Sequence, residues 1–165
     1  MSERDPAQAV VLFGAVDFDA LQERALSTPR LRTNHNFHLG DDDLSHRFLN
    51  VLAKGTYVPP HRHTAPPKSE AFVILRGEIA FFTFSDEGEV TAAHRLAAGD
   101  PTLPCGIDIL PGVWHAITAL SETAVCYEVK PGPYTPFGDK VLAPFAPPEG
   151  DARAPMYLAS LLAKL

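Results

Sequence analysis

The segment Gly55–His63, which reads GTYVPPHRH, decides how the rest of the chain is interpreted. Its two histidines, His61 and His63, are separated by one residue, and residues i and i+2 of a β-strand project from the same face. Both imidazoles can therefore bind one ion if this part of the chain is extended. The preceding prolines are typical of strand ends and turns. The segment thus predicts a strand that carries part of a metal site.

A third histidine follows a second turn. Pro111-Gly112 is a tight-turn signal, and the strand expected after it carries His115. That strand can bring His115 in from the opposite side of a barrel. Three imidazoles, with or without a carboxylate, suit Zn, Fe, Ni, Cu or Mn and leave coordination positions open. We therefore predict one divalent transition-metal ion on His61, His63 and His115.

The central part of the chain, residues 37–130, alternates short runs of strand-forming residues with turn residues. Many short strands at near-even spacing are typical of an antiparallel sandwich or barrel. The strands are expected at residues 72–75, 79–84, 90–96, 107–110, 113–120 and 123–129.

Two helices are expected outside this barrel. Asp17 as a cap, followed by apolar residues at helical spacing, predicts one that ends at Thr28-Pro29. Leu158, Leu161, Leu162 and Leu165 predict a second near the C-terminal end, with Asp151 as its cap. The 165 residues then form one domain with a lead-in at 1–36, the barrel at 37–130, and a proline-rich strap with a helix at 131–165.

Composition argues against some partners. The formal net charge of −6 and the scattered Lys and Arg residues argue against a nucleic-acid surface. No apolar run approaches the ~20 residues that span a bilayer, and the polar start Met1–Pro6 lacks a signal-peptide pattern. We expect a cytoplasmic protein without membrane contact. Cys105 and Cys126 are expected to be reduced and mostly buried.

The spacing of Gly55, His61, His63, Glu70 and Gly77 resembles the first motif of the cupins, and Pro111-Gly112-x-x-His115 resembles the end of the second. The resemblance implies an all-β fold: a double-stranded β-helix, or jelly-roll barrel, with a metal site. The gap between His63 and Glu70 is longer than usual, the second motif is compressed, and Ala119 replaces a frequent Asn. An extra bulge at Pro66-Pro67 could turn Glu70 inward as a fourth ligand; otherwise Glu70 is a candidate catalytic base.

A closer resemblance covers residues 34–165, and it is to the WbuC family of cupin-fold metalloproteins. It implies a metal-binding barrel whose relatives occur among surface-polysaccharide genes, and it implies no particular reaction. The motifs that carry it are Asn34–His38, His61–His63, Pro66–Lys68, Leu75–Gly77, Trp114–His115 and Glu128–Tyr134.

Strand alternation predicts the surroundings of the ion. If Glu70 faces the barrel interior, Phe72 and Ile74 do so too, and His115 brings Val113 and Ile117 to the same side. Trp114 then faces the opposite way and packs outside the barrel. We expect an apolar interior with a small polar cluster at one end.

The inward-facing Phe72 is a candidate for substrate binding, and four further residues are candidates as well. Tyr57 could offer its hydroxyl, or it could pack at the rim. Lys68 could bind an anion, or it could be solvated. His35 and His38 could line the pocket mouth or cross to another subunit, or they could lie in a hydrogen-bonded edge or turn. His46 and His94 are expected at the surface.

Two classes of function fit these features. One is a metalloenzyme acting on a small polar or sugar-derived molecule, either isomerase- or epimerase-like or an iron-dependent dioxygenase. The other is a non-catalytic module that binds or senses a small ligand through its metal. Exposed sheet edges and terminal helices favour a homodimer in either case.

Overall fold

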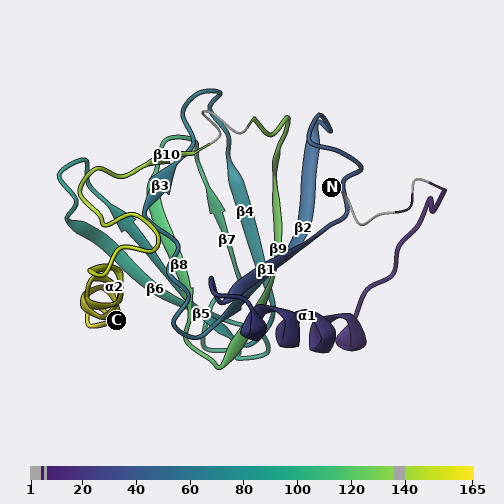
Figure 1. The fold of residues 1–165 in the computed structure, drawn as a ribbon, viewed down its shortest axis with the longest axis horizontal. Helices are drawn as coiled ribbons and strands as arrows, with labels where there is room; N and C mark the ends of the chain where they lie inside the picture. The colour runs from purple at the N-terminus through teal and green to yellow at the C-terminus, as the bar shows by residue number, and fades with distance from the viewer. Residues whose placement is uncertain (1–4, 6, 136–139) are drawn as a thin grey trace.

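The computed structural model describes residues 5, 7–135 and 140–165, and within them two five-stranded antiparallel sheets face each other (Figure 1). The first sheet has the order β1 (Arg32–Asn36), β2 (Ser45–Ala53), β9 (Thr123–Pro131), β4 (Glu70–Arg76) and β7 (Gly106–Ile109). The second has the order β10 (Val141–Leu142), β3 (His61–Arg62), β8 (Trp114–Ala119), β5 (Glu78–Phe84) and β6 (Val90–Ala97). This is the jelly-roll arrangement that the sequence predicts, with two short helices added.

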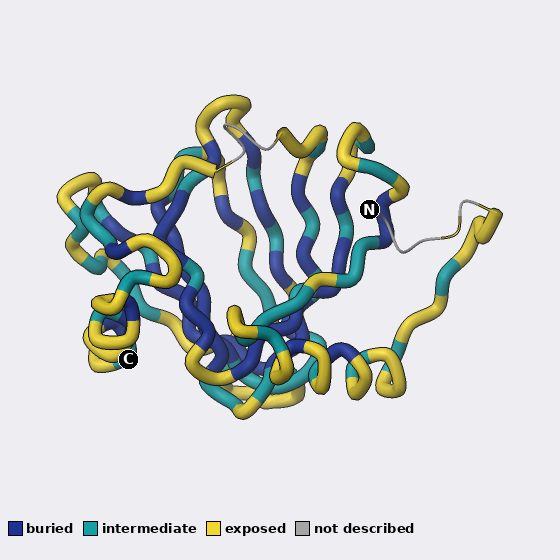
Figure 2. Tube along the Cα trace, viewed as in Figure 1, coloured by how far each residue is buried: buried dark blue, intermediate teal, exposed yellow. Residues whose placement is uncertain are grey.

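The core lies between the two sheets and follows the alternation of the strands. On β4, Glu70, Phe72 and Ile74 are buried and Val73 is exposed, so the predicted inward face is confirmed. Figure 2 shows the same contrast, with buried residues along the strands and exposed residues in the helices and loops. The residues of this core are Leu52, Phe72, Ile74, Ile79, Phe81, Leu96, Ile109, Ile117, Ala119, Ala124 and Cys126.

Helix α1 (Ala15–Ser27) covers the outer face of the first sheet. Its buried residues Leu21 and Ala25 pack in one cluster with Leu49 and Val125. The helix is capped by Gly14, whose N–H donates to the Asp17 carboxylate at 2.7 Å. The expectation that Asp17 itself is the cap is therefore wrong, because Asp17 lies in the first turn and reaches back to the cap. The helix ends before Thr28, as predicted.

Helix α2 (Ala154–Leu162) packs against the second sheet through Leu161, which contacts the cluster of Phe82 and Trp114. Its cap is Arg153 rather than Asp151. The Asp151 carboxylate accepts a hydrogen bond from the Arg153 N–H at 2.8 Å, so it stabilises the approach to the helix from just outside it. Neither helix of the described chain has the length and apolar character that crossing a bilayer requires.

The sheets extend beyond the predicted barrel of residues 37–130. Strand β1 lies within the segment that we expected to be a lead-in, and β10 lies within the C-terminal strap. Both are edge strands, β1 pairing with β2 and β10 with β3. The polar sequence RTNHN of β1 and the two-residue length of β10 carry no alternating apolar pattern, which is why they were not predicted.

Candidate metal centre

Four buried side chains converge between the two sheets: His61, His63, Glu70 and His115. Their candidate ligand atoms all lie within 4.8 Å of one another. His61 on β3 is paired in register with His115 on β8, whereas Glu70 is the first residue of β4 in the other sheet. His63 directly follows β3. The group therefore joins both sheets at one end of the core and could hold a metal ion.

Backbone carbonyls orient two of the imidazoles. Pro59 O accepts a hydrogen bond from His61 Nδ1 at 3.0 Å, and Val113 O accepts one from His115 Nδ1 at 2.9 Å. Because a carbonyl can only accept, each Nδ1 carries a proton and each Nε2 is left for the centre of the group. This is the usual way in which a protein fixes the tautomer of a metal-binding histidine.

The contacts of His115 provide a test of whether the group fits a cation. Its Nδ1 faces Val113 O, and its Nε2 lies 2.9 Å from Glu70 Oε2, so both ring nitrogens face oxygen acceptors. A neutral imidazole has only one N–H to donate. A second positive species, either a proton or a metal ion, is needed between Nε2 and the carboxylate. His63 Nε2 lies 3.2 Å from Glu70 Oε1, so it is a further candidate ligand atom beside the same carboxylate. Together, the imidazole nitrogens and the carboxylate fit a divalent ion.

A tight turn explains how Glu70 reaches the group despite its longer spacing from His63. Thr64 and Pro67 form an antiparallel bridge, so the residues between them form a tight turn and the chain returns toward β4. On the other side, the Gly112 N–H donates to His63 O at 3.0 Å and holds the two motifs together. The structure thus turns Glu70 inward by the route that the Pro66-Pro67 interpretation required.

Burial and the neighbouring side chains together shift the pKa values of His61 and Glu70. Burial lowers the pKa of His61 well below its usual value, and the positive charges of Lys140 and His115 lower it further. For Glu70, burial raises the pKa, but hydrogen bonds from His115 and His63 and the charge of Lys130 outweigh it, and the pKa falls well below its ordinary value. A neutral imidazole and an ionised carboxylate are the forms that bind metals.

The sequence analysis missed a buried polar network beside this group. Lys130 Nζ lies 3.5 Å from Glu70 Oε1 and 3.6 Å from Glu128 Oε1, and Asn50 Nδ2 donates to Glu128 Oε2 at 2.9 Å. Burial, with the negative charge of Glu70, raises the pKa of Glu128 to about 7. Alternation along β9 from the buried Cys126 could have placed Glu128 and Lys130 on the inward face, although it could not have shown that Asn50 contacts Glu128.

A cavity of about 600 Å³ opens onto this network and onto the candidate metal group. Its wall contains both apolar and charged residues, which is typical of a small-molecule site. Phe72 lines it, as the sequence suggested for a substrate-binding residue. The other lining residues are Thr28, Pro29, Arg30, Arg32, Thr33, Asn34, Phe48, Asn50, Val58, His61, Glu70, His115, Ile117, Glu128, Lys130 and Lys140.

Four predicted substrate-binding residues do not line this cavity, and three of them make contacts elsewhere. The Tyr57 hydroxyl donates to Pro147 O at 2.8 Å and its ring packs on Tyr157, so Tyr57 is part of the packing around α2. Lys68 is buried and donates to Pro133 O at 2.6 Å, so it is neither solvated nor in the cavity. His35 lies on β1 with its ring against Phe37.

His38 lies in a second hollow of about 490 Å³. It is stacked on His46, with ring centroids 4.0 Å apart, and both side chains are buried. The expectation that His46 is a surface residue is wrong, because its Nε2 bonds to Asp41 O at 3.2 Å and its ring covers His38. His94 is exposed, as expected.

The remaining expectations concern packing. Trp114 packs outside the core, beneath the Arg62 guanidinium at 4.1 Å, and donates to Asp86 Oδ1 at 2.8 Å, as predicted for a residue that faces away from His115. Both cysteines are free thiols, but only Cys126 is buried. Cys105 is exposed because it lies in the loop just before β7 rather than within a strand.

Several solved structures resemble this chain in fold at low sequence identity. An uncharacterized conserved protein with a double-stranded β-helix domain from Klebsiella pneumoniae has 14% identity and a TM-score of 0.58, with 87% of this chain and 98% of that chain covered. The capsular polysaccharide assembling protein CapF from Staphylococcus aureus has 19% identity and a TM-score of 0.56 over 70% of this chain. A recombinant oxalate oxidase in complex with glycolate has 16% identity and a TM-score of 0.51 over 72%.

This chain spans 32% of the length of CapF and 58% of that of the oxalate oxidase. At these identities the likeness defines the fold, and the molecule is a cupin-type double-stranded β-helix with a buried His and Glu group. The model of a family described as a domain of unknown function (DUF6016) matches residues 13–96, just over half of the 165 residues. The chain belongs to this family. No curated protein matches it by sequence.

Proposed function

We propose that this protein binds one divalent transition-metal ion, Zn, Fe, Ni or Mn, on His61, His63, Glu70 and His115, and that it acts on a small polar or sugar-derived molecule. The observation that carries the proposal is the position of the group. Three of its members, His61, Glu70 and His115, also line the cavity of about 600 Å³, so a ligand in the cavity would reach the ion. A bound ion would polarise a carbonyl or hydroxyl oxygen or activate a water molecule.

Glu128 is the proton acceptor or donor in this proposal. Glu70 belongs to the ligand set, so the role of catalytic base passes to the other carboxylate of the cavity. A pKa of about 7 lets Glu128 exchange a proton near neutral pH. Asn50 Nδ2 holds one oxygen of Glu128, and Lys130 lies beside the other. Asn50 Oδ1 is buried without a hydrogen-bond partner in the described structure, which leaves an acceptor for a polar ligand.

Isomerisation or epimerisation suits this arrangement, because each needs a base beside a polarised oxygen. An action on sugar derivatives is supported by the resemblance to the WbuC family, and the fold neighbour CapF is itself named for capsular polysaccharide assembly. Iron in the site would favour oxygen chemistry. Non-catalytic binding or sensing is the second candidate, and the cavity on the metal group serves it equally well. Metal identification on protein purified without chelators, followed by assays for turnover, separates these cases.

The ligand assignment is tested by His61→Ala. Losing an outer partner of a ligand already costs 10–100-fold in metal affinity, so losing the ligand should cost about 100-fold or more. Elemental analysis measures bound metal, and circular dichroism reports whether the barrel remains folded. The exposed His94 provides the matched control, and His94→Ala should keep its metal. Equal metal content in the two variants would overturn the assignment.

A further inference from the structure

The cavity beside the metal group concentrates positive charge. The chain as a whole is acidic, with 14 Lys and Arg against 20 Asp and Glu. Nevertheless, Arg30, Arg32, Lys130 and Lys140 all line this one cavity, and the carboxylates lining it are Glu70 and Glu128. Glu149 faces two of the cations from outside the lining. Four cations thus meet three carboxylates, and a divalent ion on Glu70 would increase the positive excess.

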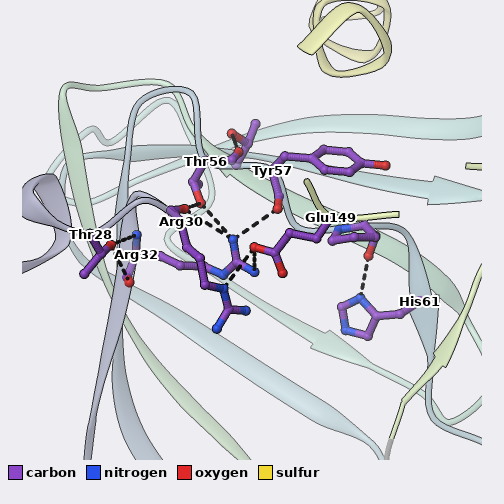
Figure 3. Close-up of polar contacts among 9 residues, drawn as sticks. Thr28, Arg30, Arg32, Thr56, Tyr57, His61 and Glu149 are labelled. Carbon is purple, nitrogen blue, oxygen red and sulfur yellow. Dashed lines mark hydrogen bonds and ion pairs between the residues drawn. The ribbon is translucent and has the colours of Figure 1, made fainter. Parts of the chain in front are cut away.

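Arg32 is a fixed part of the wall. Its Nη1 donates to Thr56 Oγ1 at 3.3 Å and to Tyr57 O at 3.1 Å, and its Nη2 lies 2.6 Å from Glu149 Oε1. Its side chain is only 11% exposed. Figure 3 shows the guanidinium surrounded by these partners. Arg32 therefore contributes a positive charge that cannot turn away into solvent.

Arg30 is the accessible cation of the pair. Its Nε lies 2.9 Å from the same Glu149 oxygen, and its side chain is 63% exposed. Figure 3 shows Arg30 and Arg32 on the same Glu149 carboxylate. Within the described chain, the two terminal nitrogens Nη1 and Nη2 of Arg30 have no protein partner. A guanidinium edge of this kind binds carboxylate and phosphate oxygens in a two-pronged geometry. Glu149 already demonstrates that the arginine pair holds a carboxylate.

Three of these four cationic residues also line the neighbouring hollow that contains His38. Arg30, Lys130 and Lys140 line both the cavity of about 600 Å³ and the hollow of about 490 Å³. A neutral ligand that covered them would remove their water without supplying negative charge, at a cost in free energy. An anion in the same place would replace that water with ion pairs.

We propose that the cavity binds a small ligand with an oxyanion group, a carboxylate or a phosphate ester, held at the mouth by Arg30 and Lys140. The other end of the ligand reaches the side lined by His61, Glu70 and His115. The inference rests on the proposed function, because it places that second end at the metal group. It adds the chemical class of the ligand.

The test uses the zinc-loaded chain of 165 residues and titrates it calorimetrically with three probes of known chemistry. Malonate represents a carboxylate, glycerol 2-phosphate represents a phosphate ester, and glucose is the neutral comparison. We expect at least one anion to bind more tightly than glucose, and the preferred anion identifies the oxyanion. Arg30→Gln should weaken that binding about tenfold or more. Arg95→Gln is the matched control, because Arg95 is an exposed arginine paired with Glu78 and does not line the cavity.

Metal content is measured on every sample, so the two proposals fail separately. Failure of the wild type to retain any of zinc, iron, nickel or manganese overturns the proposed function. Full zinc occupancy with no anion binding, or with tighter binding of glucose, overturns only the oxyanion inference. Equal anion affinity in Arg30→Gln and Arg95→Gln also overturns it. Because Arg30 is largely exposed, the folded state should persist in its variant, and circular dichroism verifies this.

Discussion

At the scale of single residues, the centre depends on contacts that reach across the two sheets. Glu70 lies between His63 and His115, and Lys130 connects it to Glu128. The pKa values of the two carboxylates are shifted in opposite directions. The pKa of Glu70 is lowered, despite its burial, by hydrogen bonds from His115 and His63 and by the charge of Lys130, and the pKa of Glu128 is raised by burial with the charge of Glu70. One carboxylate is suited to binding a cation and the other to carrying a proton.

The raised pKa of Glu128 predicts a pH dependence of stability. The group moves from about 4.5 in the unfolded chain to about 7 in the folded protein, so the folded state binds more protons between these values. Its contribution to stability is complete below pH 4.5 and is lost as the pH rises through 7, by up to about 3 kcal/mol. Glu70 has a lowered pKa, so its contribution is lost only when the pH falls below its ordinary range.

Urea unfolding of chelator-treated protein between pH 5 and pH 8 measures this effect. The free energy of unfolding of the wild type should decrease with rising pH relative to Glu128→Gln, whose side chain does not titrate. Parallel pH profiles for the two proteins would contradict the prediction.

The sequence predicted the residues whose pattern is local. His61 and His63 follow from strand parity, although the strand itself covers only His61 and Arg62. Glu128, Lys130 and Asn50 could not be placed as a network, because their contact joins strands β2 and β9, which are distant in sequence. For Tyr57 the sequence left open a pocket role or packing at the rim, because strand parity does not show that its hydroxyl reaches Pro147 O.

At the scale of elements, both helices and the strands β4 to β9 were predicted, whereas the polar edge strand β1 and the apolar strand β2 were not named as strands. Strands β4 to β9 each overlap an expected run, because alternation determines which residues face the core. Strand β1 is polar and is stabilised by its pairing with β2. The strand propensity of its own residues does not predict that pairing. Helix α1 packs on the outside of the first sheet through Leu21 and Ala25, opposite the core.

Because α1 lies away from the candidate metal centre, a substitution in this helix should change the stability of the fold without changing metal binding. Leu21→Ala should destabilise the protein by about 2–3 kcal/mol, because it removes a buried side chain from the cluster beneath the helix. Bound metal per folded molecule should not change, since the helix lies on the face away from the centre. Leu26→Ala on the same helix is the control, because Leu26 is 48% exposed. Thermal unfolding and elemental analysis test both statements, and a loss of metal in folded Leu21→Ala would refute the separation.

At the scale of the whole molecule, each sheet has two edges. Strands β1 and β7 end the first sheet, and β10 and β6 end the second. Open edges are commonly covered by pairing with another chain, and we propose that the protein is a homodimer.

Sedimentation velocity over a range of concentrations tests the dimer. The expected mass is twice the 17.9 kDa of one chain. A mass of one chain at every concentration would refute the proposal without affecting the metal centre, because all four members of that group come from a single chain.

Because of the bridge between Thr64 and Pro67, the separation of His63 and Glu70 along the chain does not determine their distance in space. The chain enclosed by the bridge is a side loop, and the residues on either side of it meet as though the loop were shorter. Natural or engineered variants could lengthen or trim this loop while the donor atoms stay where they are. The number of residues between His63 and Glu70 is then free to drift among relatives, and a search pattern that fixes that number would overlook chains with the same centre.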